Sequence, residues 1–300
     1  MRVLVSGSSG LIGSALVRVL RDEGADVLRL VRRPVAAPDE VSWDPVAGRT
    51  PDLDAVDGLD AVVHLAGAGV GDRRWTPQYR NEILASRVDS TTLLAMAIAA
   101  VERKPRVFLS GSAVGFYGAS GDAELDEDSP SGDDFLADVC RKWEAATKPA
   151  VAAGVRTVVL RSGIVLSTRG GALGKVLPLF RAGLGARLGS GHQYVSWIAR
   201  PDHVAAVRFL IDAEGVRGPV NLTAPNPVTN ATYTKAIGRA VHRPAWLISP
   251  EPALKVALGG FAETIVTGQR VLPRRLLDAG FSFDYPALDV ALPALLAADA

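Results

Sequence analysis

A glycine-rich segment near the start of the chain has the spacing of a phosphate-binding turn. It lies between the apolar run Val3–Val5 and a helical pattern that starts at Leu11, and it reads Gly7-Ser8-Ser9-Gly10-Leu11-Ile12-Gly13. In such a strand–turn–helix unit the glycines permit the tight turn, the approach of a pyrophosphate to backbone N–H groups and close packing of helix on strand. The helix N-terminus adds partial positive charge. The segment predicts a dinucleotide site, with an ordinary glycine-rich loop as the alternative.

The choice between NAD and NADP depends on the end of the next strand, about 20 residues further on. NAD-binding proteins place Asp or Glu there, which holds the ribose 2′-hydroxyl. This chain has Arg32-Arg33 directly after Leu30-Val31 and no acid. Guanidinium groups bind a 2′-phosphate in a fork geometry, whereas a carboxylate would repel it. The pair therefore favours NADP, although two arginines on a surface loop can also have no ligand.

The elements that must position these residues alternate in the first half of the chain. Short β-branched runs at Val3–Val5, 26–31, 41–43, 61–65, 107–109 and 157–160 alternate with helical patterns at 11–23, 76–103 and 135–153. This alternation predicts an α/β fold of the Rossmann type, with a doubly wound parallel sheet. Further helical patterns lie at 201–212, 231–241 and 252–266 among clusters of Gly and Pro. We expect a dinucleotide-binding domain over residues 1–160, with sheet contributions from later residues, and a smaller substrate lobe with a C-terminal helical segment over 161–300.

Composition excludes several classes of function. The net charge is +1 and no basic block is visible, so we expect a small phosphorylated ligand and no nucleic acid. Cys140 is the only cysteine and the histidines are scattered, so we expect neither a disulfide nor a metal site. The longest strongly apolar stretch, about Leu93–Val101, is too short for a membrane, which needs about 20 residues. The N-terminal apolar run is too short for a signal peptide. We expect a cytoplasmic protein that has no membrane contact.

Three segments resemble the extended short-chain dehydrogenases/reductases: the glycine-rich turn, Asp60-Ala61-Val62-Val63-His64-Leu65-Ala66-Gly67, and Ser110-Gly111-Ser112-Ala113-Val114-Gly115-Phe116-Tyr117-Gly118. A closer match to one atypical subgroup covers nearly the whole chain. It is carried by Arg74-Trp75-Thr76, Ser86-Arg87, Phe135-Leu136-Ala137, Trp143-Glu144, Gly189–Gly191, Ser196–Ile198, Arg243-Pro244, Val271–Pro273 and Ala279–Phe281. These are the epimerase-family, or nucleoside-diphosphate-sugar-epimerase-like, proteins, most of which have no established reaction.

The resemblance implies roles for several residues. Leu65, Ala66 and Gly67 would line the adenine and phosphate side of the cofactor, and Ser110 and Ser112 would lie near the nicotinamide. Arg87 stands where extended members usually carry Asn, and is counted here with the cofactor-binding residues. Segments 161–165 and 197–202 would border the substrate pocket, with Arg161 and Trp197 as candidate contacts. Core packing is an equal alternative for Trp197.

The acid/base dyad of the extended dehydrogenases is missing. Hydride transfer at an alcohol carbon needs a group that moves the hydroxyl proton. The family uses Tyr-x-x-x-Lys, usually with Glu four residues beyond; the lysine holds the nicotinamide ribose and lowers the pKa of the tyrosine. When the helix is aligned on Glu144, the lysine position falls on Cys140 and the tyrosine position on Leu136. Lys142 points about 200° away from Cys140 around the helix, so we expect it to face solvent.

Other residues must therefore supply any acid/base chemistry. Tyr117, supported by Ser112, is the best candidate, with packing under the cofactor loop as the alternative. Glu144 is a candidate base if buried, or it satisfies a neighbouring backbone group. Cys140 is either a reactive thiol or, as is usual on a buried helix face, a small apolar side chain.

The leading hypothesis is an NADP(H)-dependent oxidoreductase or epimerase-like enzyme that acts on a small substrate, such as a nucleotide sugar or carbonyl compound. The alternative is a non-catalytic NADP(H)-binding redox sensor or assembly factor. A structural protein with a vestigial nucleotide site is a third reading, against which the intact glycine set argues. Neither the substrate nor the oligomeric state follows from the sequence.

Overall fold

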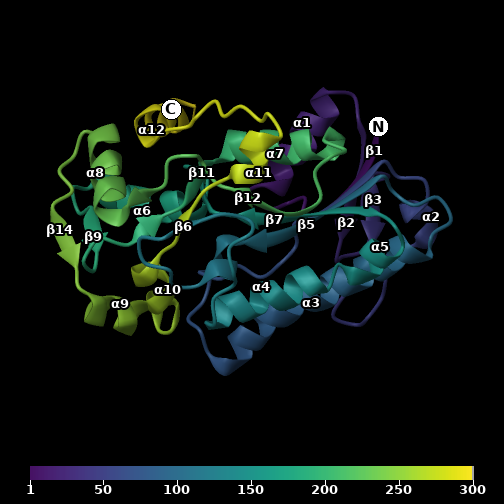
Figure 1. Ribbon diagram of the computed structural model, residues 1–300, viewed down its shortest axis with the longest axis horizontal. Coiled ribbons are helices and arrows are strands. Elements are labelled where there is room, and N and C mark those ends of the chain that lie inside the picture. Colours follow the sequence, from purple (N-terminus) through teal and green to yellow (C-terminus); the bar gives the residue numbers. More distant parts are fainter. Residues whose placement is uncertain (299–300) are drawn as a thin grey trace.

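A seven-stranded parallel sheet forms the centre of the molecule (Figure 1). The computed structural model describes residues 1–298, without the side chains of residues 257–258. The strands are β1 (Arg2–Ser6), β2 (Asp26–Val31), β3 (Glu40–Ser42), β4 (Ala61–His64), β5 (Val107–Ala113), β7 (Arg156–Ser162) and β12 (Gly218–Leu222). Their order is β12-β7-β5-β4-β1-β2-β3. The strand order reverses between β1 and β4, and this is the point at which α/β sheets bind ligands at their carboxyl edge.

Alternate residues of each strand point to opposite faces, which gives two separate cores. On one face Val3, Val5 and Val63 pack with α1 (Gly13–Asp22) and α7 (Arg200–Asp212). On the other face Leu4, Val62 and Phe108 pack with α3 (Pro77–Ala100) and α5 (Lys148–Ala152). Figure 1 shows α1 and α7 above the sheet and α3, α4 (Phe135–Ala145) and α5 below it. The cofactor edge therefore has α1 on one side and α3 with α4 on the other.

Helix α3 is long and apolar enough to cross a membrane by length and composition. Its residues Leu94, Ala95 and Ile98 are fully buried beneath Leu4 and Phe108 of the sheet. The apolar face of this helix is thus covered by the protein itself.

The second lobe is built from later residues around its own core, in which α6 (Gly171–Arg181), α8 (Asn230–Ala240) and α12 (Leu288–Ala297) meet. Pairs of short strands connect its loops: β8 (Ile164–Leu166) with β11 (Trp197–Ala199), β9 (Ala186–Leu188) with β14 (Leu247–Ser249), and β10 (Tyr194–Val195) with β13 (Val228–Thr229). Helices α9 (Glu251–Leu258) and α10 (Phe261–Thr267) follow. The short helix α2 (Leu53–Val56) and the 3₁₀ turn η1 (Val114–Tyr117) belong to the sheet domain.

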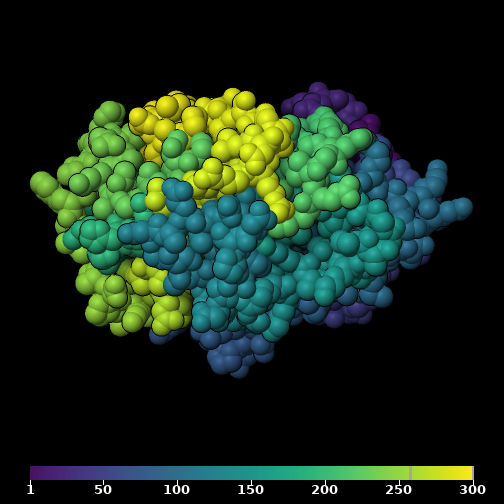
Figure 2. Space-filling view, viewed as in Figure 1, coloured from purple at the N-terminus to yellow at the C-terminus, as the bar shows by residue number. Residues whose placement is uncertain are grey.

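The C-terminal segment connects the two parts. Strand β15 (Arg270–Val271) pairs with β6 (Glu124–Leu125), and α11 (Arg274–Asp278) packs against β12. Figure 2 shows this segment, in yellow, spread over the upper surface between the green lobe and the purple N-terminal part. Sheet domain and lobe therefore share an extended interface.

The predicted Rossmann-type fold is confirmed, but two predicted helices are each divided. The pattern at 135–153 forms α4 and α5 because Pro149 lacks an N–H and cannot continue the first helix. The pattern at 252–266 forms α9 and α10, which are separated by Gly259-Gly260, where Gly259 has a φ of 61°. Strand β12 and helix α6 were not predicted.

Candidate active site

The glycine-rich turn has the close contacts that its sequence predicts. Gly7 has a φ of 66°, and a Cβ there would lie 2.8 Å from the carbonyl of Leu65 at the end of β4. A Cβ at Gly13 would collide with the Gly7 carbonyl oxygen. The Gly10 N–H closes the turn on that same oxygen at 3.0 Å. Helix α1 has Ile12 as its N-cap and no side-chain cap. The Ser14 N–H bonds to the Gly10 carbonyl oxygen, whereas the N–H groups of Leu11, Ile12 and Gly13 have no such partner within residues 1–298 and are available to an anion. The residues present fit a pyrophosphate.

A buried polar chain holds the turn against β4 and α3. Ser6 lies 2.6 Å from Nδ1 of His64, and Nε2 of His64 lies 3.1 Å from Ser90 Oγ. Ser90 donates its hydroxyl to the Ser86 carbonyl at 2.6 Å, so it accepts from Nε2–H, and Nδ1 accepts from Ser6. Burial lowers the pKa of His64 to about 3, so the ring stays neutral. Sequence reasoning treated His64 only as part of a strand motif and missed this role.

Of the two arginines predicted to bind the 2′-phosphate, one is paired with a carboxylate and the other is not. Arg33 forks onto Glu40, with N–O distances of 2.8 and 2.6 Å, and that hydrogen bond is the main cause that lowers the Glu40 carboxyl pKa. Arg32 is exposed and makes no side-chain hydrogen bond or ion pair within residues 1–298. Sequence reasoning missed the acid because Glu40 belongs to β3, beside β2 in the sheet. Arg32 is therefore the guanidinium better able to meet a phosphate.

Arg87 reaches the carboxyl end of β4 from α3. A Cβ at Gly67 would lie 3.3 Å from Arg87 Cζ, and the guanidinium stacks over the Trp143 ring of α4 at 5.0 Å. Trp143 is held in turn by a hydrogen bond from its indole N–H to Thr91, at 2.9 Å. The structure thus brings together Gly67, Arg87 and helix α4.

The predicted catalytic side chains lie in one hydrogen-bonded network. Ser112, at the end of β5, donates to Glu144 Oε1 at 2.8 Å. Arg161, on neighbouring β7, donates one hydrogen bond to each carboxylate oxygen of Glu144, at 2.8 and 2.9 Å. The third guanidinium nitrogen of Arg161 donates to the Tyr117 oxygen at 3.0 Å, and the guanidinium carbon lies 3.5 Å from the centre of the Phe116 ring. Arg161 thus ties β5, η1 and α4 together.

Tyr117 is enclosed by this network. Its hydroxyl donates to Oδ1 of Asn221 at 2.7 Å, and only 2% of the residue is exposed. Burial raises the pKa of Tyr117 to about 12, against the lowering effect of Arg161. The phenol therefore keeps its proton at neutral pH. Asn221 lies on β12, the unpredicted strand, so no local pattern announced this partner.

The two positions of the missing dyad are apolar or inert. Leu136 packs beside Gly115, where an added Cβ would lie 3.2 Å from it. The Cys140 thiol donates to the Ala113 carbonyl at 3.6 Å, and burial raises its pKa to about 12. Lys142 instead pairs with Asp138 at 2.7 Å on the exposed side of α4.

Trp197 and Ser110 are fully buried. The Trp197 ring belongs to the core of the lobe, and its indole N–H donates to the Asn226 carbonyl at 3.1 Å. This placement matches the packing alternative for Trp197. Ser110 stands two residues before Ser112 on β5, in register with His64 of β4.

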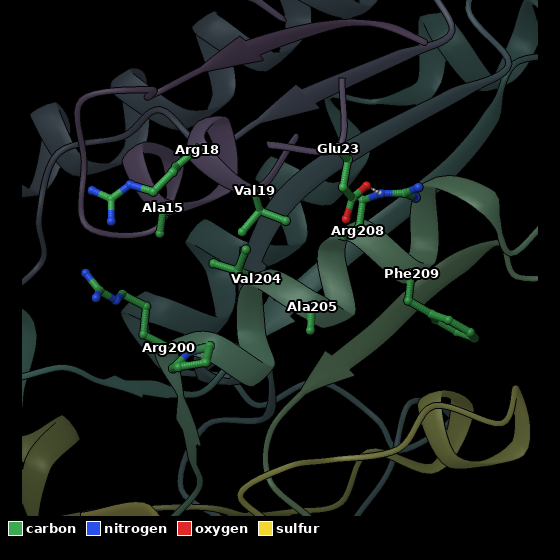
Figure 3. A pocket seen from close by; sticks show the side chains of 10 residues that line it. Ala15, Arg18, Val19, Glu23, Arg200, Val204, Ala205, Arg208 and Phe209 are labelled. Carbon is green, nitrogen blue, oxygen red and sulfur yellow. Dashed lines mark hydrogen bonds and ion pairs between the residues drawn. The ribbon is translucent and has the colours of Figure 1, made fainter. Parts of the chain in front are cut away.

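Two cavities lie beside the turn and α1. One, of about 300 Å³, is lined by Ser9, Gly10, Leu11 and Ser14 together with three arginines: Arg18 of α1, Arg169 of the turn before α6, and Arg200 of α7. The second, of about 560 Å³, is the groove between α1 and α7. Figure 3 shows Arg18 and Arg200 extending side by side at one end of this groove, and the Glu23–Arg208 ion pair at the other. The smaller cavity adjoins the phosphate turn, whereas the groove is separated from β5 by α1 and α7.

Comparison with known proteins identifies the family. The model of the NAD dependent epimerase/dehydratase family matches residues 3–222. The chain belongs to this family. A domain of unknown function, DUF1731, matches residues 249–295, which run from α9 into α12. Epimerase family protein ML0860 of Mycobacterium leprae is 45% identical over 97% of this chain and 94% of its own length.

Solved structures give the same assignment. The crystal structure of human epimerase family protein SDR39U1 (isoform 2) with NADPH is 38% identical, with a TM-score of 0.91 over 98% of this chain and 99% of that one. A nucleoside-diphosphate sugar epimerase from Corynebacterium glutamicum is 37% identical, with a TM-score of 0.81 over 99% of this chain and 58% of that one. The resemblance found in the sequence is therefore confirmed for the family and the fold.

Proposed function

We propose that this protein binds NADP(H) and acts as an oxidoreductase or epimerase-like enzyme on a small substrate, such as a nucleotide sugar or a carbonyl compound. The observation that carries the proposal is the phosphate turn, where Gly7 and Gly13 leave no room for a Cβ and the N-terminus of α1 is uncapped. The human relative, 38% identical over nearly the whole chain, was crystallised with NADPH. That likeness supports NADPH as the cofactor of this chain.

Arg32 would hold the 2′-phosphate, while Arg33, neutralised by Glu40, would shape the loop. Thermal-shift titration with NADP(H) and NAD(H) tests this assignment, since a ligand that binds only the folded state raises the melting temperature. We expect Arg32→Ala to weaken NADPH binding at least about tenfold, as the loss of a charge-assisted hydrogen bond to phosphate does. Arg33→Ala, the matched control next to it, should cost less. If neither dinucleotide stabilises the wild type, the proposed function is wrong.

Ser112, Tyr117 and Glu144 remain the proposed catalytic group, with Arg161 as a proposed substrate contact. For these side chains to act, the network around Arg161 must open when substrate binds, because in this structure Tyr117 donates to Asn221. Tyr117→Phe removes the proton and keeps the ring. With a substrate found by screening nucleotide sugars and carbonyl compounds, loss of turnover would support Tyr117, and unaltered turnover would remove it from the mechanism.

A second candidate is a non-catalytic NADP(H)-binding sensor or assembly factor. The specific observation in its favour is that Leu136 and Cys140 occupy the dyad positions while Tyr117 is enclosed. This reading predicts NADPH binding that changes the affinity for a partner protein, with no turnover of any screened substrate.

A further inference from the structure

Arg87 is a partly buried cation without a counter-charge among the described residues. Within residues 1–298 its side chain forms no ion pair, and its one hydrogen bond runs to the Ile83 carbonyl, at 3.1 Å. Its titratable neighbours are the Cys140 thiol and the Tyr79 phenol. Both are neutral at pH 7, because burial raises the pKa of each. Burial also lowers the pKa of the Arg87 guanidinium itself. A desolvated charge that lacks a carboxylate is costly, which indicates a functional reason for its presence.

The fold places this cation at the nicotinamide half of the cofactor site. The pyrophosphate belongs to the N-terminus of α1, on one side of the sheet edge, and the adenosine end to Arg32 after β2. The other half of the dinucleotide must therefore run away from β2, over the ends of β4 and β5. Arg87 lies between Gly67, which the resemblance assigns to the phosphate side, and Trp143 of α4, whose ring packs against Gly111 of β5, so it lies where the cofactor passes from the phosphates towards the nicotinamide. Helices α3 and α4 cover the face opposite α1 (Figure 1).

The two redox forms of the cofactor differ in charge at this end. The nicotinamide ring of NADP⁺ carries one positive charge, and the ring of NADPH is neutral. A fixed cation close by repels the oxidised ring and leaves the reduced ring unaffected. Its attraction to the phosphates is the same for both forms and cancels in the ratio of their affinities.

We propose that Arg87 makes this site select the reduced cofactor, NADPH, over NADP⁺. The inference rests on the proposed binding of NADP(H) and deepens it. The Cys140 position, where the extended dehydrogenases carry lysine, has lost its charge, and Arg87 restores one from the neighbouring helix. Unlike that lysine, Arg87 meets no carboxyl or phenolate group that would offset its charge.

The test is the ratio of two dissociation constants, Kd for NADP⁺ over Kd for NADPH, measured by calorimetry without any substrate. At an effective dielectric constant of about 20, like charges within about 10 Å repel enough to change binding at least about tenfold. We expect a ratio of about ten or more for the wild type and for Arg87→Lys, and a ratio near one for Arg87→Met and Arg87→Gln. Arg80→Met is the matched control, since Arg80 stands two turns earlier on α3 and also stacks on an aromatic ring, that of Trp75 at 5.4 Å. It should leave the ratio unchanged.

Several outcomes would overturn the inference. A wild-type ratio near one does so without any variant, and so does a ratio that survives Arg87→Met. 2′-Phospho-ADP-ribose, which lacks the nicotinamide ring, tests whether Arg87 acts on the diphosphate instead of the ring. If Arg87→Met weakens this fragment and both cofactors equally, Arg87 binds the diphosphate and not the ring. Absence of binding by the wild type to every one of these ligands would instead refute the proposed function.

Discussion

The variant Glu144→Ala tests whether Glu144, at the centre of the buried network around Arg161, has a structural or a catalytic role. In the wild type Glu144 neutralises Arg161 through two hydrogen bonds of 2.8 and 2.9 Å, and the Arg161 side chain is only 4% exposed. Burial alone would lower the pKa of Arg161, but the hydrogen bond and charge of Glu144 outweigh it, so the net pKa is raised. Without Glu144 the cation stays charged and buried, with Tyr117 and the Phe116 ring as its main remaining partners.

Removal of one partner of a buried ion pair costs about 3–5 kcal/mol. Since the Tyr117 oxygen and the Phe116 ring still contact the guanidinium, we expect the lower end, about 3 kcal/mol. For a chain of 300 residues, 3 kcal/mol lowers the melting temperature by about 5 °C. The assay is thermal unfolding of Glu144→Ala, Arg161→Met and the double variant. Because the double variant leaves no unpaired charge, it should recover part of the loss, and the cycle gives the coupling energy.

A different result would refute the structural reasoning. If Glu144→Ala costs less than about 1 kcal/mol, Arg161 does not depend on this carboxylate for its charge balance. If in addition turnover disappears while the fold is unchanged, Glu144 acts on substrate, and the network in this structure is a resting arrangement of a catalytic base. Glu144→Gln serves as the control, because the amide oxygen can still accept the bond from Ser112 while the charge is lost.

Three further predictions follow from buried ionisable groups. Cys140, with a pKa raised to about 12, should not react with Ellman's reagent in the native protein at pH 8 and should give one thiol after unfolding. Burial lowers the pKa of His64 to about 3 and that of His203 to about 4, so between pH 6.5 and pH 4 only the unfolded chain binds protons at these residues. As the pH falls below 6.5, the free energy of unfolding should therefore decrease by about 1.4 kcal/mol per pH unit for each histidine. Melting curves should show about half that slope in His64→Asn, and an unchanged slope would contradict the assignment. Burial raises the pKa of Glu127, so its contribution to stability is full below the pKa it has in the unfolded chain and is lost as the pH rises through the pKa it has in the folded protein. Glu127→Gln should therefore make the stability less dependent on pH, and a variant whose stability depends more on pH would refute this reasoning.

The sequence predicted the parts of the site that are local along the chain. The phosphate turn depends on Gly7, Gly10 and Gly13 within one strand–turn–helix unit, so spacing alone indicates its geometry. The loss of the dyad likewise depends on positions within a single helix, α4. In both cases the residues that decide the outcome lie close together along the chain, between Gly7 and Gly13 and between Leu136 and Glu144.

The parts that the sequence did not predict depend on neighbours in the sheet. Glu40 reaches Arg33 because β3 pairs with β2, and Asn221 reaches Tyr117 because β12 lies beside β7. Strand β12 begins with the pair Gly218-Pro219 and is short, so its pattern does not distinguish it from a loop. The role of Arg161 also required the structure, since its partner on α4 and its contact in η1 come from different elements.

The two residues of the missing dyad differ in whether another residue supplies the lost group, and this difference bears on function. The positive charge lost at Cys140 has a counterpart in Arg87, which enters from α3 and keeps contact with helix α4 through Trp143. The proton-transfer group lost at Leu136 has no such counterpart facing the same place, because Tyr117 donates its proton to Asn221 behind the network. As proposed, the site therefore keeps a residue that acts on the cofactor, whereas in this arrangement Tyr117 is not free to act on a substrate hydroxyl. A protein that binds NADPH tightly and NADP⁺ weakly can work either as a reductase that takes its proton from water or as a sensor of the reduced cofactor. The affinity ratio should consequently be measured before any substrate is sought, since a high ratio restricts the search to substrates to be reduced and to partners that respond to NADPH.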